Sequence, residues 1–361
     1  MTNILECREL TAQRGFVSVL SIPHLAIQEG EVLALIGPNG AGKSTLLLAL
    51  ARLIKASGTM LFRGEEVGGG LSELAYRRRV TMVFQEPLLL DTTVEKNVAT
   101  GLKLRGMKRA EIDKRVQEAL ERFGIGHLIY RHARKLSSGE AKRVSLARAF
   151  ALRPEIVFLD EPFSPLDPPT REGLLIDLKR ALRETNTTAV VATHEKNEAL
   201  VLSQRVCVMK DGQIVQMGSP VEVMNHPADE FVASFVGVET IIPAVVLRKT
   251  GGILTVKTEK DLLLSAVGDQ EPGERVLCCL RPEQVTILAD GGREHTSARN
   301  LFSGKIVELA SLGMFWRVTL DCGFPLIAYV TGQAVEELGL KIGACVSASF
   351  KATAVHVIKV Y

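Results

Sequence analysis

A glycine-rich stretch from Gly37 to Thr45 carries the residues of this chain that are best suited to chemistry. It reads GPNGAGKST and lies between two apolar runs, residues 32–36 and 46–54, which predict a buried strand and a helix. Glycines let the backbone turn a row of N–H donors toward one point, and the start of the helix adds positive charge there. Lys43 supplies a mobile cation, and the hydroxyl of Ser44 is suited to ligating Mg²⁺. The pattern therefore predicts a phosphate-binding loop that takes a nucleoside triphosphate. The residues assigned to this loop are Gly37, Pro38, Asn39, Gly40, Ala41, Gly42, Lys43, Ser44 and Thr45.

A pair of acidic residues follows a second apolar run. Residues 156–160 read IVFLD, so a buried strand ends in Asp160, and Glu161 comes directly after it. A carboxylate at a strand end can hold Mg²⁺ through water, and its neighbour can orient an attacking water. On its own, such a strand end is more often an ordinary cap. Combined with the glycine loop, it predicts hydrolysis of the bound triphosphate.

Length and composition are those of an ordinary globular protein. The 361 residues suffice for two or three domains, and 46% of them are hydrophobic and 24% charged. The net charge of +3 is too small to indicate nucleic-acid binding. The basic run 77–79 is better explained as a solvated helix face, so no nucleic-acid partner is expected.

Cysteines and hydropathy bound the cellular context. The six cysteines show no metal-binding spacing and are interpreted as small core residues in a reducing compartment. The first ten residues carry charges where a signal peptide would be apolar, and no apolar run approaches membrane-spanning length. We therefore expect a cytoplasmic chain without a transmembrane segment, which can still dock on a membrane protein.

Buried strands alternate with helices through the first half of the chain. This alternation predicts an α/β fold with a mixed, mostly parallel sheet covered on both faces. Residues 88–153 interrupt it and are predicted to form a helical subdomain. From about residue 237 short β-rich segments separated by glycine turns predict a small β-barrel or sandwich. The predicted helices cover residues 71–79, 94–105, 108–123, 139–152, 170–185 and 195–203.

Four further motifs accompany the glycine loop and the acidic pair in a fixed order. They are VFQEP with Gln85, LSSGE at 136–140, SPLD ending in Asp167, and VATHE with His194. Each motif is weak by itself, but together and at these intervals they are specific. Over roughly residues 3–237 the chain resembles the ATP-binding-cassette ATPases, whose signature usually reads LSGGQ.

The resemblance implies a composite ATP site in a homodimer. The glycine loop, Gln85 and Asp160 would hold ATP, and the Mg²⁺ ligands would be Ser44, Gln85 and Asp160. Glu161 would position the water, and His194 would contact the γ-phosphate. Asp167 would connect the two sites across the interface. The signature residues that the partner copy would supply are Ser137, Ser138, Gly139 and Glu140.

Three positions depart from the family pattern. Ser138 replaces a signature glycine and Glu140 replaces the usual glutamine, and both changes look compatible with the loop. In the motif AQRGF, Arg14 stands where importer cassettes usually carry an aromatic residue. The guanidinium of Arg14 can stack on adenine, or Phe16 can take that place.

The C-terminal region resembles the accessory domains of bacterial importer ATPases. LRPEQVTI at 280–287 resembles their recurring RPE segment, and residues 297–358 resemble a molybdate-binding, molbindin-like (TOBE) domain with an OB-like β-barrel. The resemblance divides the chain into a cassette at 1–237, a first β segment at 238–290 and the molbindin-like domain at 295–361, with a linker near 289–296. The residues that would hold a regulatory oxyanion are Ser297, Ala298, Arg299, Lys351 and Ala352. The alternative is a domain that only dimerises or regulates and binds no ligand.

The favoured interpretation is the ATPase subunit of an oxyanion importer at the cytoplasmic face of the cell membrane. It would bind permease subunits through the helical subdomain and, through them, an external oxyanion-binding protein. Tungstate is the first choice of substrate and molybdate the second. Import of sulfate, a polyamine or a sugar is the alternative within the class. Alternatives of another class are a soluble, non-transport cassette ATPase and an oxyanion sensor.

Overall fold

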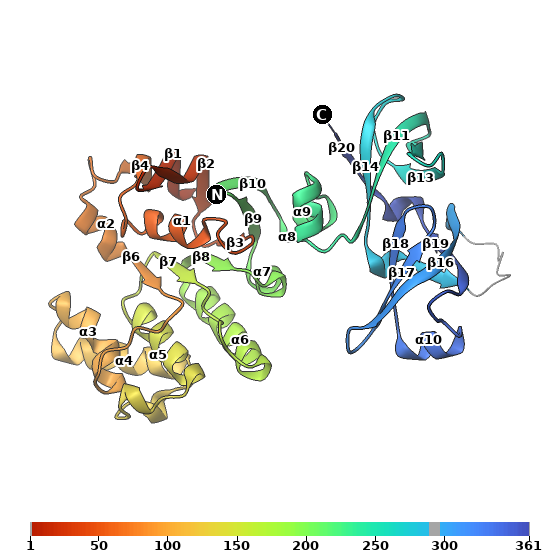
Figure 1. Ribbon diagram of the computed structural model, residues 1–361. Helices are drawn as coiled ribbons and strands as arrows, with labels where there is room; N and C mark the ends of the chain where they lie inside the picture. Colours follow the sequence, from red (N-terminus) through yellow and green to blue (C-terminus); the bar gives the residue numbers. More distant parts are fainter. Residues whose placement is uncertain (1, 289–296, 361) are drawn as a thin grey trace. The chain divides into compact units, whose positions relative to one another are not determined.

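The computed structural model describes residues 2–288 and 297–360, without the side chain of Arg14. The chain divides into two compact units, residues 1–220 and 221–361, which we describe separately (Figure 1). The first unit thus ends before residue 237, the cassette boundary expected from the sequence. The linker expected at 289–296 lies outside the described residues.

A six-stranded sheet forms the centre of the first unit, in the order β10-β9-β3-β8-β7-β6. Every neighbouring pair is parallel except β9 and β10, so the mixed, mostly parallel sheet expected from the sequence is confirmed. Strands β3, β7 and β8 are buried along their whole length, which explains their uninterrupted apolar sequences. The hairpin of β9 and β10 was not predicted. The strands are β3 (Val32–Ile36), β6 (Val80–Val83), β7 (Ile156–Asp160), β8 (Thr188–Thr193), β9 (Arg205–Lys210) and β10 (Gln213–Gly218).

A second, antiparallel sheet lies over one face of this core, in the order β2-β1-β4-β5. Its strands are β1 (Asn3–Arg14), β2 (Val17–Gln28), β4 (Ser57–Phe62) and β5 (Glu65–Glu66). Helix α1 (Lys43–Leu50) lies between the two sheets, and its apolar side chains belong to the same buried cluster as residues from both (Figure 1). Burial on both sides of α1 fixes the helix whose first turn carries Lys43 and Ser44.

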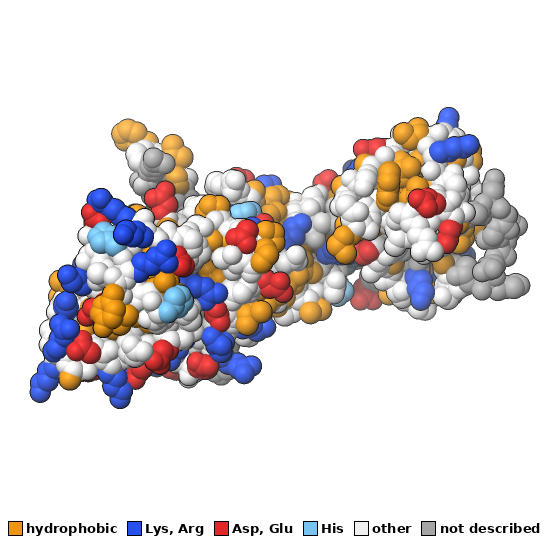
Figure 2. Space-filling model, turned by 90° about the horizontal axis from the view of Figure 1, so that it is seen from below, with side chains coloured by type: hydrophobic (Ala, Val, Ile, Leu, Met, Phe, Trp, Pro, Cys, Tyr) orange, Lys and Arg blue, Asp and Glu red, His pale blue; other side chains and the backbone are white. Residues whose placement is uncertain are grey.

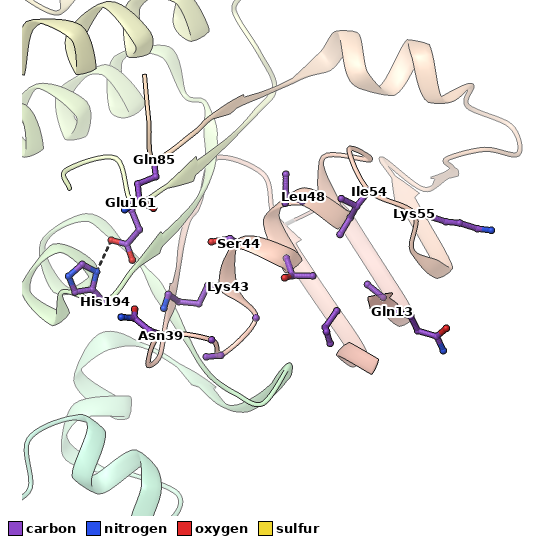
Figure 3. A pocket seen from close by; sticks show the side chains of 16 residues that line it. Gln13, Asn39, Lys43, Ser44, Leu48, Ile54, Lys55, Gln85, Glu161 and His194 are labelled. Atoms are coloured by element: carbon purple, nitrogen blue, oxygen red, sulfur yellow. Dashed lines mark hydrogen bonds and ion pairs between the residues drawn. The ribbon is translucent and has the colours of Figure 1, made fainter. Parts of the chain in front are cut away.

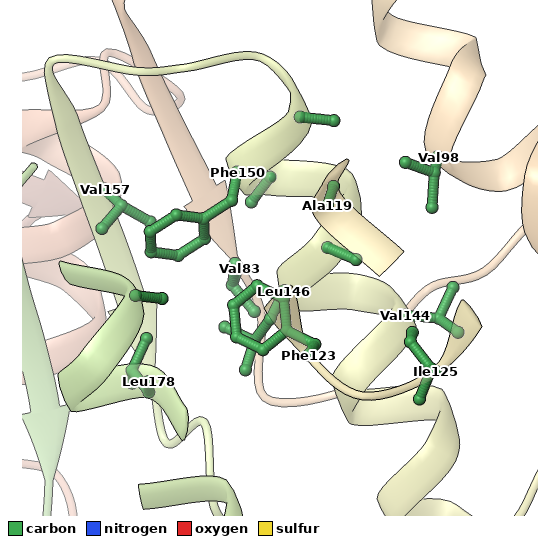
Figure 4. Packing of buried hydrophobic residues seen from close by; sticks show 14 of the residues in the cluster. Val83, Val98, Ala119, Phe123, Ile125, Val144, Leu146, Phe150, Val157 and Leu178 are labelled. Carbon is green, nitrogen blue, oxygen red and sulfur yellow. The ribbon is translucent and has the colours of Figure 1, made fainter. Parts of the chain in front are cut away.

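The helical subdomain and α6 cover the opposite face of the core sheet. The buried rings of Phe123 and Phe150 meet edge to face at 5.4 Å, and Val157 of β7 and Leu178 of α6 belong to the same cluster (Figure 4). This packing ties the helical subdomain to the core sheet, so the signature helix α5 is held close to β7. The helices of this unit are α2 (Glu73–Arg79), α3 (Val94–Leu104), α4 (Arg109–Arg122), α5 (Ser138–Ala151), α6 (Pro168–Thr185) and α7 (Lys196–Leu202), with short 3-10 turns at Gly126–Leu128 and Ala133–Lys135. These six helices and α1 correspond to the seven helices predicted from the sequence in this unit.

The second unit contains two five-stranded antiparallel sheets, β13-β12-β11-β14-β20 and β15-β19-β16-β17-β18. The first-sheet strands are β11 (Thr240–Thr250), β12 (Ile253–Thr258), β13 (Leu263–Val267), β14 (Arg275–Leu280) and β20 (His356–Lys359). The second-sheet strands are β15 (Thr286–Leu288), β16 (Asn300–Ser311), β17 (Trp316–Asp321), β18 (Pro325–Val330) and β19 (Cys345–Phe350). The helical elements are α8 (Pro220–Asn225), α9 (Glu230–Phe235) and α10 (Gly332–Glu337), with 3-10 turns at Pro282–Gln284 and Ala352–Ala354.

The two sheets of this unit exchange strands. β20, near the end of the chain, pairs with β14, and β15 pairs with β19. The first sheet consists of β11 to β14 together with β20, which comes from the end of the chain. The second sheet consists of β16 to β19 together with β15, which precedes residue 289. Both sheets contribute to one buried cluster. The expected division near residue 290 thus separates two segments that fold together.

Within the described residues, no helix combines the length and the apolar character needed to cross a bilayer.

Candidate nucleotide site

The glycine loop connects β3 to α1 through backbone conformations that only glycine adopts readily. Gly37 has φ 155° and Gly42, the residue that precedes α1, has φ 97°. A Cβ on Gly37 would lie 2.3 Å from the carbonyl oxygen of Met209 on β9. The loop therefore needs glycine at Gly37 both for its backbone angle and for its close approach to the neighbouring strand.

Lys43 is folded back over this loop. Its side chain is buried, and Nζ donates hydrogen bonds to the carbonyl oxygens of Gly37 at 2.8 Å and Pro38 at 3.1 Å. Burial lowers the pKa of Lys43, and the nearby charges of Glu161 and Asp160 oppose that shift. The loop carbonyls thus hold an ammonium group in place, and a phosphate could replace them as its partner.

Ser44 and Asp160 join the loop to the end of β7. The Ser44 hydroxyl donates a hydrogen bond to Oδ1 of Asp160 at 2.9 Å. Burial raises the pKa of Asp160, while the Ser44 hydrogen bond and the two lysines nearby, Lys43 and Lys142, act in the opposite direction. A hydroxyl and a carboxylate at this separation are hard oxygen donors of the kind that Mg²⁺ prefers.

The donor set fits Mg²⁺ only together with a phosphate. Among the described residues, no group of three or more His, Cys, Asp or Glu side chains could hold a metal ion. The amide of Gln85 lines the same pocket as Ser44 and offers one more oxygen (Figure 3). Since Mg²⁺ is commonly bound by one or two carboxylates plus substrate phosphates, Ser44, Gln85 and Asp160 suit an ion that arrives with a nucleotide.

Glu161 and His194 contact each other at one end of the pocket. Nδ1 of His194 lies 2.8 Å from Oε2 of Glu161 (Figure 3). The backbone of Glu161 has φ 44°, a left-handed conformation that is uncommon for a residue with a side chain. Its N–H donates to the carbonyl oxygen of Ala192 on β8. The ends of the adjacent strands β7 and β8 therefore bring a carboxylate and an imidazole into contact. Acid–base chemistry on a bound water requires groups of this kind close together.

The pocket around these groups has a volume of about 810 Å³. Lys43, Ser44, Gln85, Glu161 and His194 line one end of the pocket. The other end is lined by residues that were not predicted from the sequence (Figure 3). The missed residues are Ala12, Gln13, Val19, Leu48, Ile54 and Lys55. Leu48 had a signal in the sequence, because it follows Ser44 by one helical turn and so faces the same side. The others come together only through the pairing of β1 with β2 and the chain after α1.

The residues suggested for adenine stacking lie at the turn between β1 and β2. Phe16 is fully exposed there and does not line the pocket. The side chain of Arg14 lies outside what the structure describes. Among the described residues, Gln13 and Val19 from the hairpin and Ile54 beyond α1 line this part of the pocket.

The signature residues form the first turn of α5. Ser137 is the N-cap, and its Oγ accepts a hydrogen bond from the N–H of Glu140 at 3.3 Å. The Glu140 carboxylate accepts the N–H of Ser137 at 2.7 Å and lies 3.3 Å from Arg131. This backbone hydrogen bond is the main cause of a lowered pKa at Glu140. The glutamate thus completes a capping box, and its carboxylate is hydrogen-bonded by both the backbone and the side chain of Ser137.

Helix α5 begins at Ser138, one residue before the start predicted from the sequence, so Gly139 lies inside its first turn. A Cβ on Gly139 would meet Cγ2 of Thr170 on α6 at 2.6 Å. Asp167 caps α6 by accepting the N–H of Thr170 at 3.2 Å. The signature turn and the start of α6 are thus packed against each other. None of the described residues of the signature lines the pocket of its own chain.

The residues suggested for an oxyanion lie at one end of the β16–β19 pair. Asn300 on β16 pairs with Phe350 on β19. Arg299 precedes Asn300 and Lys351 follows Phe350, so both residues lie next to this pair at the same end of the two strands. Ser297, Arg299 and Lys351 are exposed, Ala298 is half-buried, and Ala352 is buried. Asn300 itself is structural: its amide bonds the backbone N–H and carbonyl of Ser265 at 2.7 and 2.9 Å. The register therefore places Arg299 and Lys351, both exposed, at the same end of this strand pair.

Fold and site define a P-loop ATPase, and comparison with known proteins gives its family. The ABC transporter model matches residues 20–164 and the TOBE domain model matches residues 296–357. The chain belongs to the ATP-binding subunits of ABC transporters.

Several curated relatives match nearly the whole chain. A molybdate/tungstate import ATP-binding protein of Pyrococcus horikoshii, WtpC, is 39% identical over 92% of this chain and 93% of its own. A spermidine/putrescine import ATP-binding protein of Nitrosomonas europaea, PotA, is 33% identical over 92% of both chains. An Fe(3+) ions import ATP-binding protein of Rhizobium meliloti, FbpC 2, is 35% identical over 89% of this chain and 83% of its own.

Two solved structures resemble the first unit. The structure of cbiO1 from Clostridium perfringens, described as part of the ABC transporter complex cbiONQ, matches with a TM-score of 0.58 at 32% identity, over 66% of this chain and 96% of its own. An ATP-binding cassette solved as a dimer in a post-hydrolysis state with ADP and Pi matches with a TM-score of 0.54 at 28% identity, over 60% of this chain and 98% of its own.

Proposed function

We propose that this ABC transporter ATPase drives the import of an oxyanion, with tungstate favoured over molybdate. The observation that carries the proposal is the 39% identity to the molybdate/tungstate import protein, which extends through the C-terminal unit as well as the cassette. The exposed Arg299 and Lys351, at the same end of one strand pair, support it, because a dianion needs convergent donors and little negative charge nearby.

In the proposed mechanism the chain binds MgATP in the pocket behind the glycine loop. Lys43 leaves the carbonyls of Gly37 and Pro38 and pairs with the outer phosphates. Ser44, Gln85 and Asp160 would hold a Mg²⁺ ion, which would supply charge compensation to the phosphates. Glu161 orients the attacking water and accepts its proton, and His194 contacts the γ-phosphate from the other side.

Hydrolysis requires a second copy of the chain in this account. Ser137 is held at the start of α5, yet the signature turn does not line the pocket of its own chain. A homodimer places Ser137 and Gly139 of each copy over the γ-phosphate in the other, with the start of α5 adding positive charge. Asp167, at the start of α6, connects the two sites. The cassette solved as a dimer with ADP and Pi supports this arrangement.

The partners follow from the transporter class. Permease subunits in the membrane would bind the helical subdomain and the segment around Gln85, which places the chain at the cytoplasmic face of the membrane. An external oxyanion-binding protein would deliver the substrate to the permease. Nucleic acid is not a proposed partner: lysines and arginines are interspersed with acidic side chains on the face of the cassette seen in Figure 2.

The C-terminal unit is proposed to bind a regulatory oxyanion between two copies, through Ser297, Ala298, Arg299, Lys351 and Ala352. Calorimetric titration with tungstate, molybdate and sulfate tests this part by itself. Heat with tungstate that Arg299→Ala and Lys351→Ala remove supports it. The absence of heat with all three anions would contradict this part of the proposal. The alternative, a domain that only dimerises or regulates and binds no ligand, would then hold.

Import of a polyamine is the second candidate, because the spermidine/putrescine relative is nearly as similar over the same length. Uptake of labelled tungstate should separate the two, measured in cells with and without the gene for this chain. We expect uptake to depend on the chain and to be reduced by excess unlabelled molybdate but not by spermidine. Uptake of spermidine, and not of tungstate, that depends on the chain would contradict the proposal.

A further inference from the structure

Lys142 is a buried lysine that the mechanism above does not use. It lies on α5, five residues after Ser137, and only 3% of its side-chain surface is exposed. Within the described residues its ammonium group forms no salt bridge with a carboxylate. Its partners are two backbone carbonyl oxygens, those of Gln85 and, at 3.4 Å, Glu161. A buried cation is costly unless it is well satisfied, so these two contacts need a reason.

Both carbonyls belong to residues whose side chains line the ATP pocket. The backbone of Glu161 is in the left-handed region, which costs roughly 1–2 kcal/mol for a residue with a Cβ. The carbonyl of Glu161 accepts two donors, Nζ of Lys142 and the N–H of Ser164 at 3.2 Å. Gln85 follows β6 in a segment without regular structure, so its carbonyl has no ladder partner to fix it. Lys142 thus donates to two carbonyl groups that have no backbone donor from a helix or a strand, although the N–H of Glu161 is bonded to Ala192 on β8.

The charge of Lys142 also matches its surroundings. Asp160 and Glu161 favour its protonated form, although burial lowers the pKa of Lys142. Lys43 and Lys142 both act on Asp160, Lys43 from the glycine loop and Lys142 from α5. Lys142 thus lies on the helical-subdomain side of the carboxylates of Asp160 and Glu161.

We propose that Lys142 is a positioning residue of the ATPase site, which fixes the backbone of Gln85 and Glu161 so that their side chains point into the pocket. This inference rests on the roles proposed above for those two side chains. It gives α5 two functions: its first turn presents Ser137 to the nucleotide of the partner copy, and Lys142 holds the groups around the nucleotide of its own. One rigid helix therefore links the two composite sites of a dimer.

Two variants test the proposal in the full-length chain. Lys142→Met removes every donor while keeping an unbranched side chain, and Lys142→Gln keeps an N–H donor without the charge. Lys114→Gln is the matched control, because Lys114 is exposed on α4. For each variant we would measure the unfolding temperature, kcat and KM for ATP, and amide hydrogen exchange at residues 84–88 and 161–164 without nucleotide.

For Lys142→Met we expect kcat to fall roughly tenfold or more with KM within about threefold, because misplacing a reacting group costs the chemical step more than binding. Hydrogen exchange at residues 84–88 and at Ser164 should be faster than in the wild-type chain. The kcat and the exchange rates of Lys142→Gln should lie between those of Lys142→Met and those of the wild-type chain. Lys114→Gln should have the kcat and the exchange rates of the wild-type chain.

Wild-type kcat and unchanged exchange in Lys142→Met would overturn the proposal. If the Met variant does not fold, Lys142→Gln carries the same comparison. A lower unfolding temperature with kcat unchanged well below that temperature would make Lys142 merely structural and would also overturn it. The exchange measurement uses no ATP, so it decides the anchoring role even if the wild-type chain proved unable to hydrolyse ATP.

Discussion

At the scale of single residues, the site is organised by hydrogen bonds that leave the reactive atoms available. Glu161 shares one carboxylate oxygen with His194, which leaves Oε1 available for a water. The hydroxyl oxygen of Ser137 caps α5 by accepting the N–H of Glu140. Glu140, which departs from the family pattern, is used as the second half of a capping box, so its charge is already engaged by the backbone N–H of Ser137.

Replacing Glu161 by glutamine should separate binding from hydrolysis. The amide keeps the size of the side chain but cannot accept the proton of the attacking water. We expect ATP binding within about threefold of wild type, hydrolysis reduced roughly 10²–10⁴-fold, and a stable ATP-bound dimer in size-exclusion chromatography. Full hydrolysis by this variant would remove Glu161 from the mechanism.

The cysteines make a separate prediction about thiol reactivity. Burial raises the pKa of Cys7 and Cys207 to about 12 and that of Cys322 to about 11, and it acts in the same way on Cys278 and Cys279. Cys345 is the exposed thiol among the six. Because the thiolate is the reacting form, titration of the native chain at neutral pH with a thiol reagent should label Cys345 rapidly and the others slowly.

Cys345→Ser is the control for that titration and should remove the fast phase. All six thiols of the wild-type chain should react after unfolding. A fast phase that survives in Cys345→Ser would show that one of the buried cysteines is accessible in solution.

At the scale of elements, the contact between α5 and α6 determines how the signature turn is presented. Gly139→Ala would bring a methyl group to within 2.6 Å of Cγ2 of Thr170, so one of the two helices must shift. Such overpacking costs about 1–3 kcal/mol in the free energy of unfolding. Thermal unfolding of Gly139→Ala should show this loss, and adding Thr170→Ser, which removes the methyl group, should recover most of it. If the double variant is no more stable than Gly139→Ala, this contact is not the cause.

Asn300 makes the corresponding prediction for the C-terminal unit. Its buried amide is bonded twice to the backbone of Ser265, so Asn300→Ala should destabilise this unit by about 1–3 kcal/mol in urea unfolding. Ser265→Ala keeps the backbone partners and should be nearly neutral. An equal loss in both variants would show that the side chain of Ser265, and not the amide of Asn300, stabilises this region.

At the scale of the whole molecule, the features that could be predicted from the sequence are those in which a chemical motif lies within a few residues of the strand and helix that position it. GPNGAGKST needs its strand and helix within nine residues of one another, so the motif already implies the elements. The same holds for Asp160 at the end of β7 and for the helices between residues 71 and 203, all of which are present.

The features that the sequence left open depend on pairing between distant segments. Nothing local to β14 or β20 indicates that they pair across more than seventy residues, or that β15 completes the sheet of β19. Ile54 and Gln13 join the pocket only because β1, β2 and α1 pack together. Lys142 looked like one charged residue of an ordinary helix until its two carbonyl partners were located.

The central claim is that each chain holds half of an ATP site and needs the signature turn of a second copy. Mixing two inactive variants tests it most directly. Lys43→Ala destroys the nucleotide half, and Ser137→Arg blocks the signature half. Each alone should hydrolyse ATP at a small fraction of the wild-type rate. An equal mixture should recover up to about a quarter of that rate, because half of the dimers then contain one intact composite site out of two. Wild-type hydrolysis by Ser137→Arg alone would contradict the account, because the site would then be complete within one chain.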